Sequence, residues 1–344
     1  WTSVSLTGNS HTIEGLAAAT IYDIRVLAEK KGIKSEYVSA KTSTTAASSL
    51  IEEISTGSEL VEWLSNANSE ATGEYKIIAD IDMHGLSAVP AAGFGGTLDG
   101  QGHVIKNWKS TTPLFTSNNG TIKNIVIESS CKFFPATAEF GTIVGDNKGT
   151  VSSCENKAAI IIADESMSAE LKLGGIVGKS SGLVEKCKNS GKISLSGTSS
   201  AAHSIGGVVG YFEGKEGKVA VDNCENKADV IFSITGTPKN MYIGGVVGSS
   251  VVNKSADMGN YGIVKDCSNS GNVTHRWTVS GSGSYCNVGG VVGYIEGDVE
   301  NLTNTGVVSL DSPSDPATVS TRPTLGGVAG YVYYNAKNCV NKGK

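Results

Sequence analysis

The sequence has little proline and few aromatic residues. Seven prolines and an aromatic content of 6% accompany 44 glycines and 39% hydrophobic residues in a chain of 344. So few large rings disfavour a globular core built around them and favour stacked Val, Ile, Leu and Ala side chains. Many glycines with few prolines suit frequent tight corners between short strands.

Long apolar runs and basic stripes are also missing. The longest apolar run, near residues 158–163, has the length of a strand and not of a membrane span. Lys and Arg are dispersed along a chain of net charge −5, so nucleic acid is not an expected partner. The chain starts at Trp1 without a signal peptide, and we expect a mature or trimmed polypeptide.

A repeat fills the chain from about residue 140 to the C-terminus. Its first block, two glycines, two β-branched residues and a glycine, stands at 174–178, 206–210, 244–248 and 289–293, with weaker copies at 141–145 and 326–330. A second block follows each copy, as in Val-Glu-Lys-Cys-Lys-Asn-Ser-Gly at 184–191. The repeats are 33, 32, 38, 45 and 37 residues long, taken between the last glycines of the first blocks. A constant core with variable insertions is typical of a solenoid.

Each repeat holds three strand-sized segments without helical periodicity: the Gly-flanked pair, the segment ending at Cys, and a third such as 192–195. The sequence therefore predicts an all-β fold, a right-handed parallel β-helix with three strands per coil over residues 75–344.

The cysteines align in one column of this β-helix. The column holds Cys154, Cys187, Cys224, Cys267 and Cys339, with Leu302, Ile125 and Trp108 at the same position in other coils. A position that accepts Cys, Leu or Ile is interior, so we expect free buried thiols, with disulfides or metal binding as the less favoured alternatives. The total of seven is odd, no C-x-x-C pair occurs, and Cys131 and Cys286 are interpreted as lying off the column in loops.

A second column lies two residues further on. It holds Asn156, Asn189, Asn226, Asn269, Asn304 and Asn341. We interpret these side chains as a hydrogen-bonded turn ladder at a corner that tolerates left-handed backbone, in preference to a binding role.

The N-terminal region differs in kind. Residues 56–59, Thr-Gly-Ser-Glu, form a capping box, which predicts a helix over 58–74 that covers the first coil, preceded by a linker at 46–57. In residues 1–45, the alternating Val4, Leu6 and Ile13, and Leu16 six residues before Tyr22, resemble the second half of a fibronectin type III domain. Because half a sandwich cannot bury its own face, we expect this partial β-sandwich to continue upstream of Trp1 or to pack on a partner. The C-terminus stops where earlier repeats begin a third strand, so we expect the natural chain to continue or the last coil to fray.

The Gly-Val-Val-Gly cores and the downstream Cys-x-Asn resemble the GLUG repeat, over roughly residues 140–344. That resemblance implies a bacterial surface protein, or the non-catalytic part of a metallo-type immunoglobulin A1 protease. Such a protease needs His-Glu-x-x-His, whereas none of His11, His84, His103, His203 and His275 is followed by Glu or lies four residues from another. We therefore expect no zinc protease site in this chain, and the sequence singles out no catalytic, cofactor or metal-binding residue.

Two functions remain. The first is a binding or structural module, extracellular or on the bacterial surface and monomeric, with host glycan or glycoprotein as its partner. Insertions at 196–204, 235–242, 278–287 and 311–324 should stack along one edge, where Tyr242, Trp277 and Tyr285 could contact sugar rings or pack on the surface.

The second is a polysaccharide lyase or glycoside hydrolase, which needs paired carboxylates or a calcium site with a base. Asp80, Asp82 and Asp99 are better explained by turn or cap roles. The remaining candidates are interpreted as loop acids without aligned partners in adjacent coils: Asp164 with Glu165, Asp222, and Asp311 with Asp315.

Overall fold

The computed structural model describes residues 13, 21–36, 38–43, 52–214, 218–252, 262–277, 285–311 and 322–344. The chain divides into two compact units, Trp1–Leu50 and Ile51–Lys344. In the first unit, β1 (Ile21–Val26) pairs antiparallel with β4 (Val38–Ser43), and β2 (Glu29–Lys30) pairs with β3 (Ile33–Lys34). Val4, Leu6 and Leu16 lie outside the described residues, so the fibronectin type III resemblance stays a prediction.

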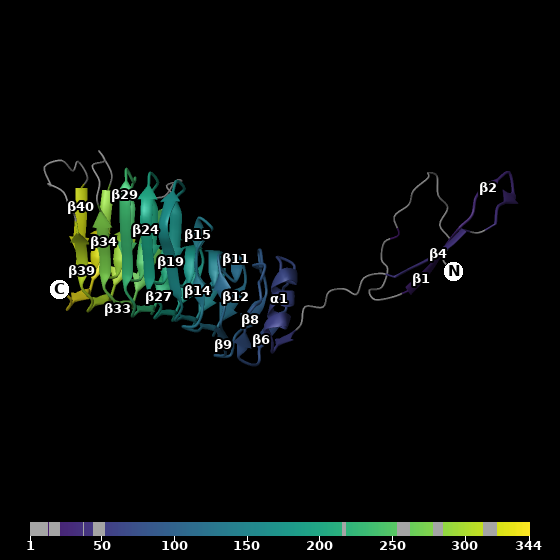
Figure 1. Cartoon of the computed structure of the whole chain (residues 1–344), viewed down its shortest axis with the longest axis horizontal. Coiled ribbons are helices and arrows are strands. Elements are labelled where there is room, and N and C mark those ends of the chain that lie inside the picture. Colours follow the sequence, from purple (N-terminus) through teal and green to yellow (C-terminus); the bar gives the residue numbers. More distant parts are fainter. Residues whose placement is uncertain are drawn as a thin grey trace. The chain divides into compact units, whose positions relative to one another are not determined.

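The second unit is a parallel β-helix, as predicted, and its coils stack from the helix α1 towards the C-terminus (Figure 1). Five parallel sheets run along the stack, which we number in the order in which the chain visits them. A complete coil, such as β17 (Thr150–Ser152) to β21 (Val177–Ser180), therefore has five strand segments where the sequence predicts three. The first repeat block spans the end of a sheet 4 strand and the start of a sheet 5 strand, and the second block supplies sheets 1 and 2.

Sheet 1 contains β5 (Glu53–Ile54), β6 (Glu74–Ile77), β8 (Thr97–Asp99), β12 (Thr121–Lys123), β17 (Thr150–Ser152), β22 (Leu183–Glu185), β27 (Val219–Asp222), β32 (Gly262–Lys265), β37 (Gly297–Glu300) and β42 (Ala336–Lys337). Sheet 2 contains β7 (Ile81–Asp82), β9 (Val104–Lys106), β13 (Val126–Ile127), β18 (Glu155–Asn156), β23 (Lys188–Asn189), β28 (Glu225–Asn226), β33 (Ser268–Asn269), β38 (Thr303–Asn304) and β43 (Val340–Asn341). Sheet 3 contains β10 (Lys109–Ser110), β14 (Lys132–Phe133), β19 (Ala159–Met167), β24 (Ile193–Ser199), β29 (Val230–Gly236), β34 (Val273–Trp277) and β39 (Val308–Asp311).

Sheet 4 contains β15 (Glu139–Phe140), β20 (Leu171–Gly174), β25 (His203–Gly206), β30 (Met241–Gly244), β35 (Tyr285–Gly289) and β40 (Arg322–Gly326). Sheet 5 contains β11 (Phe115–Asn118), β16 (Val144–Asn147), β21 (Val177–Ser180), β26 (Val209–Gly214), β31 (Val247–Val252), β36 (Val292–Ile295) and β41 (Ala329–Val332).

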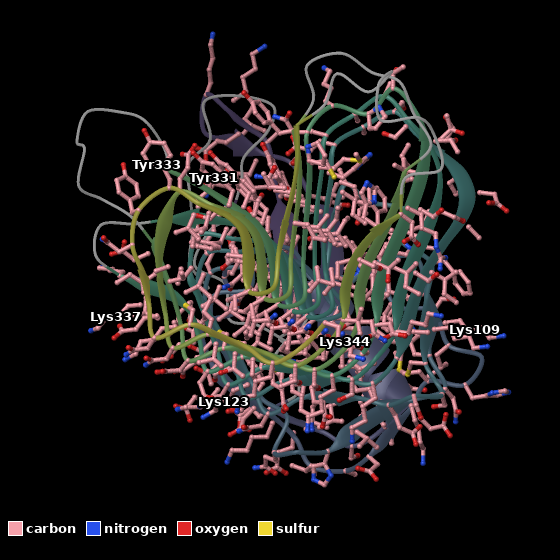
Figure 2. The ribbon with its side chains drawn as sticks, turned by 90° about the vertical axis from the view of Figure 1, so that its left-hand side faces the viewer. Lys109, Lys123, Tyr331, Tyr333, Lys337 and Lys344 are labelled. Atoms are coloured by element: carbon pink, nitrogen blue, oxygen red, sulfur yellow. The ribbon has the colours of Figure 1, made fainter. Side chains whose placement is uncertain are left out.

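The glycines of the first block let sheets 4 and 5 fold back on each other. A Cβ on Gly178 would overlap the backbone of Phe140 in sheet 4, and one on Gly210 would overlap the backbone of Leu173. On the inner side, a Cβ on Gly175 would overlap the side chain of Asn189. Only glycine permits backbone contact this close. Seen end-on, the chain accordingly doubles back on itself at this turn (Figure 2).

The N-terminal end of the β-helix is capped as predicted. Thr56 is the N-cap of the helix α1 (Gly57–Asn66). Its Oγ1 accepts from the N–H of Glu59 at 3.2 Å, and a Glu59 carboxylate oxygen accepts from the N–H of Thr56 at 3.0 Å. Trp63 is fully buried, with its ring 5.3 Å from that of Tyr75 and 5.4 Å from that of Phe94.

Two boundaries differ from the prediction. The helix ends at Asn66 and not at residue 74, and β5, within the predicted linker, pairs with β6 as a first rung of sheet 1. In the described part of the chain, no helix is long and apolar enough to span a membrane.

Candidate ligand-binding surface

The cysteine column is an interior ladder, as predicted. Cys154, Cys187, Cys224 and Cys267 are free and 1% exposed, while Cys339 in the last coil is half-buried. Leu302, Ile125 and Trp108 are buried like the cysteines whose column they share. Burial raises the pKa of Cys154 and Cys224, which disfavours the thiolate that metal binding or nucleophilic attack requires.

The other two cysteines are buried as well. Cys286 is a fully buried residue of β35, beside Met241 in the neighbouring coil, which corrects the prediction that it lies in a loop, and burial raises its pKa to about 12. Cys131 lies in the connection before β14, outside any strand, and is fully buried and free, and its Sγ donates to the carbonyl of Ile105 at 3.3 Å. The insertion before Cys286 hides its strand pattern in the sequence.

The asparagine column forms a hydrogen-bonded ladder inside the β-helix. Nδ2 of Asn189 donates to the carbonyl of Gly191 at 2.9 Å and to Oδ1 of Asn226 at 2.8 Å, and the same arrangement recurs between neighbouring coils. The left-handed backbone, however, is not at these asparagines. It falls on the residue immediately before each cysteine-column position, at Asn107, Asn124, Ser153, Lys186, Asn223, Asp266, Asn301 and Asn338.

A row of tyrosines follows the outer surface where sheets 4 and 5 face each other. We call Tyr242, Tyr294 and Tyr331 the tyrosine row. The rings of Tyr242 and Tyr294 lie 4.9 Å apart, and those of Tyr294 and Tyr331 lie 5.3 Å apart and are stacked with an angle of 14°. Tyr331 is 42% exposed, and Figure 2 shows it with Tyr333 on the opposite side of the coil from Lys109.

The tyrosine row brings together residues that sequence reasoning only partly found. Tyr242 was predicted, whereas Tyr294 and Tyr331 were missed, although each directly follows the last glycine of a first block. Of the other two predicted aromatics, Tyr285 is 49% exposed and its N–H donates to Asn240 at 3.2 Å. Trp277 ends β34 beside Ile234, and its side chain lies outside the described part of the structure.

Polar and acidic groups surround the tyrosine row. The hydroxyl of Tyr294 donates to Glu296 at 2.8 Å. The pKa of Tyr294 is raised, mainly by burial and then by this carboxylate. In sheet 4, the register places Asn287 next to Tyr242 and Thr324 next to Asn287. Among the described residues, Oδ1 of Asn287 and Oγ1 of Thr324 are buried in this wall without a hydrogen-bond partner.

Towards the N-terminus the same surface becomes charged. Nζ of Lys172 lies 4.8 Å from the ring centroid of Tyr211 and within 4 Å of the carboxylates of Glu139 and Glu170. Nζ of Lys179 lies 3.1 Å from a carboxylate oxygen of Glu213. Both ammonium groups are therefore neutralised within the protein.

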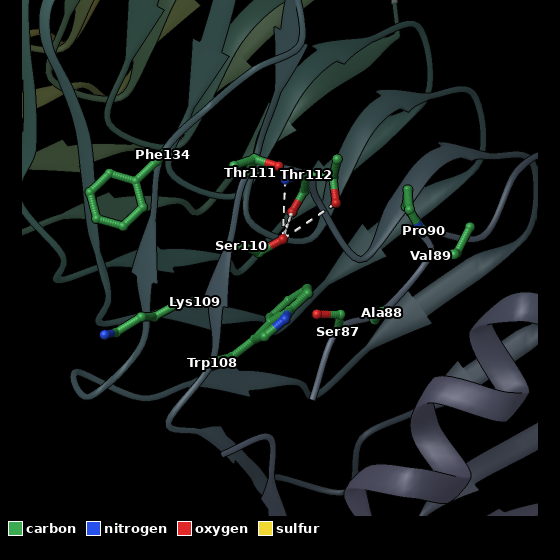
Figure 3. Close-up of a pocket in the computed structure, with 10 residues that line it drawn as sticks. All are labelled: Ser87, Ala88, Val89, Pro90, Trp108, Lys109, Ser110, Thr111, Thr112 and Phe134. Atoms are coloured by element: carbon green, nitrogen blue, oxygen red, sulfur yellow. Dashed lines mark hydrogen bonds between the residues drawn. The ribbon is translucent and has the colours of Figure 1, made fainter. Parts of the chain in front are cut away.

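A pocket of about 360 Å³, lined by none of the tyrosines of the row, lies beside β10, the first strand of sheet 3 (Figure 3). Its lining residues are Ser87, Ala88, Val89, Pro90, Trp108, Lys109, Ser110, Thr111, Thr112 and Phe134. Trp108 is only 1% exposed, and the Ser110 hydroxyl donates to the carbonyl oxygen of Thr112 at 2.8 Å. Phe134 is 43% exposed, so the pocket offers one exposed ring, whereas all three rings of the tyrosine row are partly exposed.

The histidines have structural environments. His203 and His275 are buried between sheets 3 and 4, on either side of Phe232, and burial lowers the pKa of each to about 4. A ring nitrogen of His203 lies 2.6 Å from the Ser199 hydroxyl. Among the described residues, no three His, Cys, Asp or Glu side chains are grouped so that they could hold a metal ion.

Asp82 and Asp99 have the predicted turn role, because Asp82 accepts from the N–H of His84 at 3.0 Å and Asp99 accepts from the N–H of Gln101 at 2.9 Å. Asp80 instead joins two coils, since it accepts from the N–H of Val104 at 3.1 Å.

The acids predicted to lie in loops are in strands where the structure describes them. Asp164 and Glu165 belong to β19, Asp222 to β27 and Asp311 to β39, while Asp315 lies outside the described residues. Asp222 also has an aligned acidic neighbour, because the register of sheet 1 places it beside Glu185. The prediction that Asp222 lacks an aligned partner was therefore wrong.

Comparison with known proteins gives a motif and a fold. The GLUG motif matches residues 284–309, which span β35 to the start of β39. No curated protein sequence matches the chain. A crystal structure described as that of "a putative immunoglobulin A1 protease from Bacteroides ovatus" is similar with a TM-score of 0.53 and 20% identity, covering 80% of this chain and 83% of that one. A structure described as IgA1 Protease has a TM-score of 0.49 and 14% identity, covering 89% of this chain and 24% of that one.

Proposed function

We propose that this β-helix is a non-catalytic binding module of a bacterial protein that acts at the cell surface or outside the cell, and that the tyrosine row binds glycan chains. The GLUG motif and the similar immunoglobulin A1 protease structures support an accessory repeat region. The tyrosine row carries the proposal, because its stacked rings are partly exposed, Tyr331 at 42%, and exposed aromatic surface suits the apolar faces of sugar rings.

Retention on an array of glycans and mucins tests this function. The wild-type chain should retain a subset of glycans without cleaving them, and Tyr331→Ala should weaken retention at least about tenfold, since loss of one stacking ring costs about 1.4 kcal/mol or more. Phe134→Ala is a matched control, because Phe134 is 43% exposed and Tyr331 is 42% exposed. Equal loss of glycan retention in both variants would show that the tyrosine row is not the binding surface.

A glycoside hydrolase is the second candidate, and the Glu185 and Asp222 pair favours it. Adjacent parallel strands lie about 4.8 Å apart, close to the separation of about 5 to 5.5 Å between the two carboxyl groups of retaining glycosidases. Glu185 is, however, within 3.9 Å of the ammonium group of Lys186. Cleavage of a glycan by the wild type, abolished in both Glu185→Gln and Asp222→Asn, would replace the binding function with this one.

A further inference from the structure

We infer that the tyrosine row selects uncharged glycans and disfavours those that carry sialic acid or sulfate, an inference that rests on the proposed function. The outer surface of sheets 4 and 5 that carries the row also carries five described carboxylates, Glu139, Asp146, Glu170, Glu213 and Glu296, and three described ammonium groups, Lys148, Lys172 and Lys179. These described side chains sum to two negative charges.

The three described ammonium groups of this surface are already engaged, and that of Lys148 lies 3.5 Å from a carboxylate oxygen of Asp146. Lys172 lies between Glu139 and Glu170 with its ammonium over the ring of Tyr211, and Lys179 is paired with Glu213. An anionic sugar that approached them would have to compete with carboxylates that are already in place. Recognition of sialic acid or sulfate needs the reverse, cations that lack an anionic partner.

Carboxylates lie near Tyr242 and Tyr294 of the row, and near Tyr211, which precedes the row in sheet 5. Glu296 accepts from the hydroxyl of Tyr294. The pKa of Tyr211 is raised to about 12, mainly by burial and to a smaller extent by the charges of Glu213, Glu170 and Glu296. The pKa of Tyr242 is raised in the same direction, by burial and then by Glu296 and other neighbours. A carboxylate or sulfate stacked in the row would therefore meet negative charge from both the sheet 4 and the sheet 5 side.

The experiment compares matched pairs of glycans on the intact chain, with N-acetyllactosamine and its sialylated form as the first pair. At about 50 mM salt, the neutral member should bind about tenfold more tightly, and the difference should shrink to about threefold or less at 1 M salt, where the Debye length is about 3 Å. The triple variant Glu170→Gln, Glu213→Gln and Glu296→Gln should lose the preference at low salt. The matched control Glu185→Gln, on sheet 1, should retain it.

The outcomes distinguish a failure of the charge selection from a failure of the proposed glycan binding. Equal binding of both members by the wild type, or a preference that survives both high salt and the triple variant, overturns the charge selection and leaves glycan binding in place. No retention of any pair overturns both. A thermal melt of each variant checks that the fold is retained, and Tyr294→Phe, which removes only the hydroxyl donor to Glu296, should keep the preference for the neutral member.

Discussion

Nδ2 of Asn226 donates to Oδ1 of Asn269 at 2.7 Å, although the two residues belong to different repeats. Each of these asparagines also closes the corner of its own coil, as Nδ2 of Asn226 does with the carbonyl of Ala228 at 2.7 Å. The ladder therefore fixes both the shape of a coil and its register on the next. Because the side chains are buried, these hydrogen bonds form away from competing water.

Asn226→Ala tests the ladder. The change leaves a buried donor on Asn189 and a buried acceptor on Asn269 without partners, so we expect the free energy of unfolding to fall by about 2 to 4 kcal/mol. Chemical denaturation followed by circular dichroism measures this fall. Asn119→Ala is the control, because Asn119 is exposed, and it should cost less than about 0.5 kcal/mol.

Gly210→Ala tests the close contact between sheets 4 and 5. A Cβ at residue 210 would meet the backbone of Leu173, so we expect a loss of several kcal/mol or failure to fold. In the weak first copy, a Cβ on Gly145 would lie 2.8 Å from the carbonyl oxygen of Thr116, a looser contact. Gly145→Ala should therefore lower the melting temperature less than Gly210→Ala, and the reverse order would contradict the role assigned to the turn.

Thiol accessibility tests the cysteine columns. In the native chain, only Cys339 is exposed enough to react quickly with a thiol reagent, because the other six cysteines are buried. After denaturation without reductant, all seven should react. Fewer than five free thiols under those conditions would refute the free-thiol ladder, and Cys339→Ser should remove the fast native reaction.

Acid should destabilise the β-helix through His203 and His275. Burial lowers both pKa values from 6.5 to about 4, so the unfolded chain binds more protons than the folded chain between these values. Stability should therefore be full above pH 6.5 and fall as the pH decreases towards 4, by at most about 3 kcal/mol for each histidine.

His275→Phe isolates one of the two histidines. The new ring can stack beside Phe232 as the imidazole does, at 5.4 Å between centroids, but it cannot take up a proton. We expect the slope of unfolding free energy against pH between 4 and 6.5 to fall by about half. An unchanged slope would show that His275 is not buried in its neutral form.

Much of the fold could be read from the sequence because its determinants recur within each repeat. The Gly-Gly turn, the Cys column and the Asn column are local patterns, and repetition distinguishes them from chance. Insertions interrupt that repetition, which is why Cys286 was assigned to a loop although it lies in β35. The predicted three strands became five because a single residue in left-handed backbone, such as Lys186 before Cys187, is enough to separate sheets 1 and 2.

The sequence by itself determined the parallel β-helix, its N-terminal cap and its buried columns, because these follow from hydrophobic pattern and glycine spacing. Only the tertiary structure decided where a ligand could bind. Tyr242 precedes one first block and Tyr294 follows the next, and they meet because sheets 4 and 5 fold back on each other between stacked coils. Side-chain proximity across that fold depends on strand register and on the angle between sheets, and neither is encoded in the pattern of a single repeat.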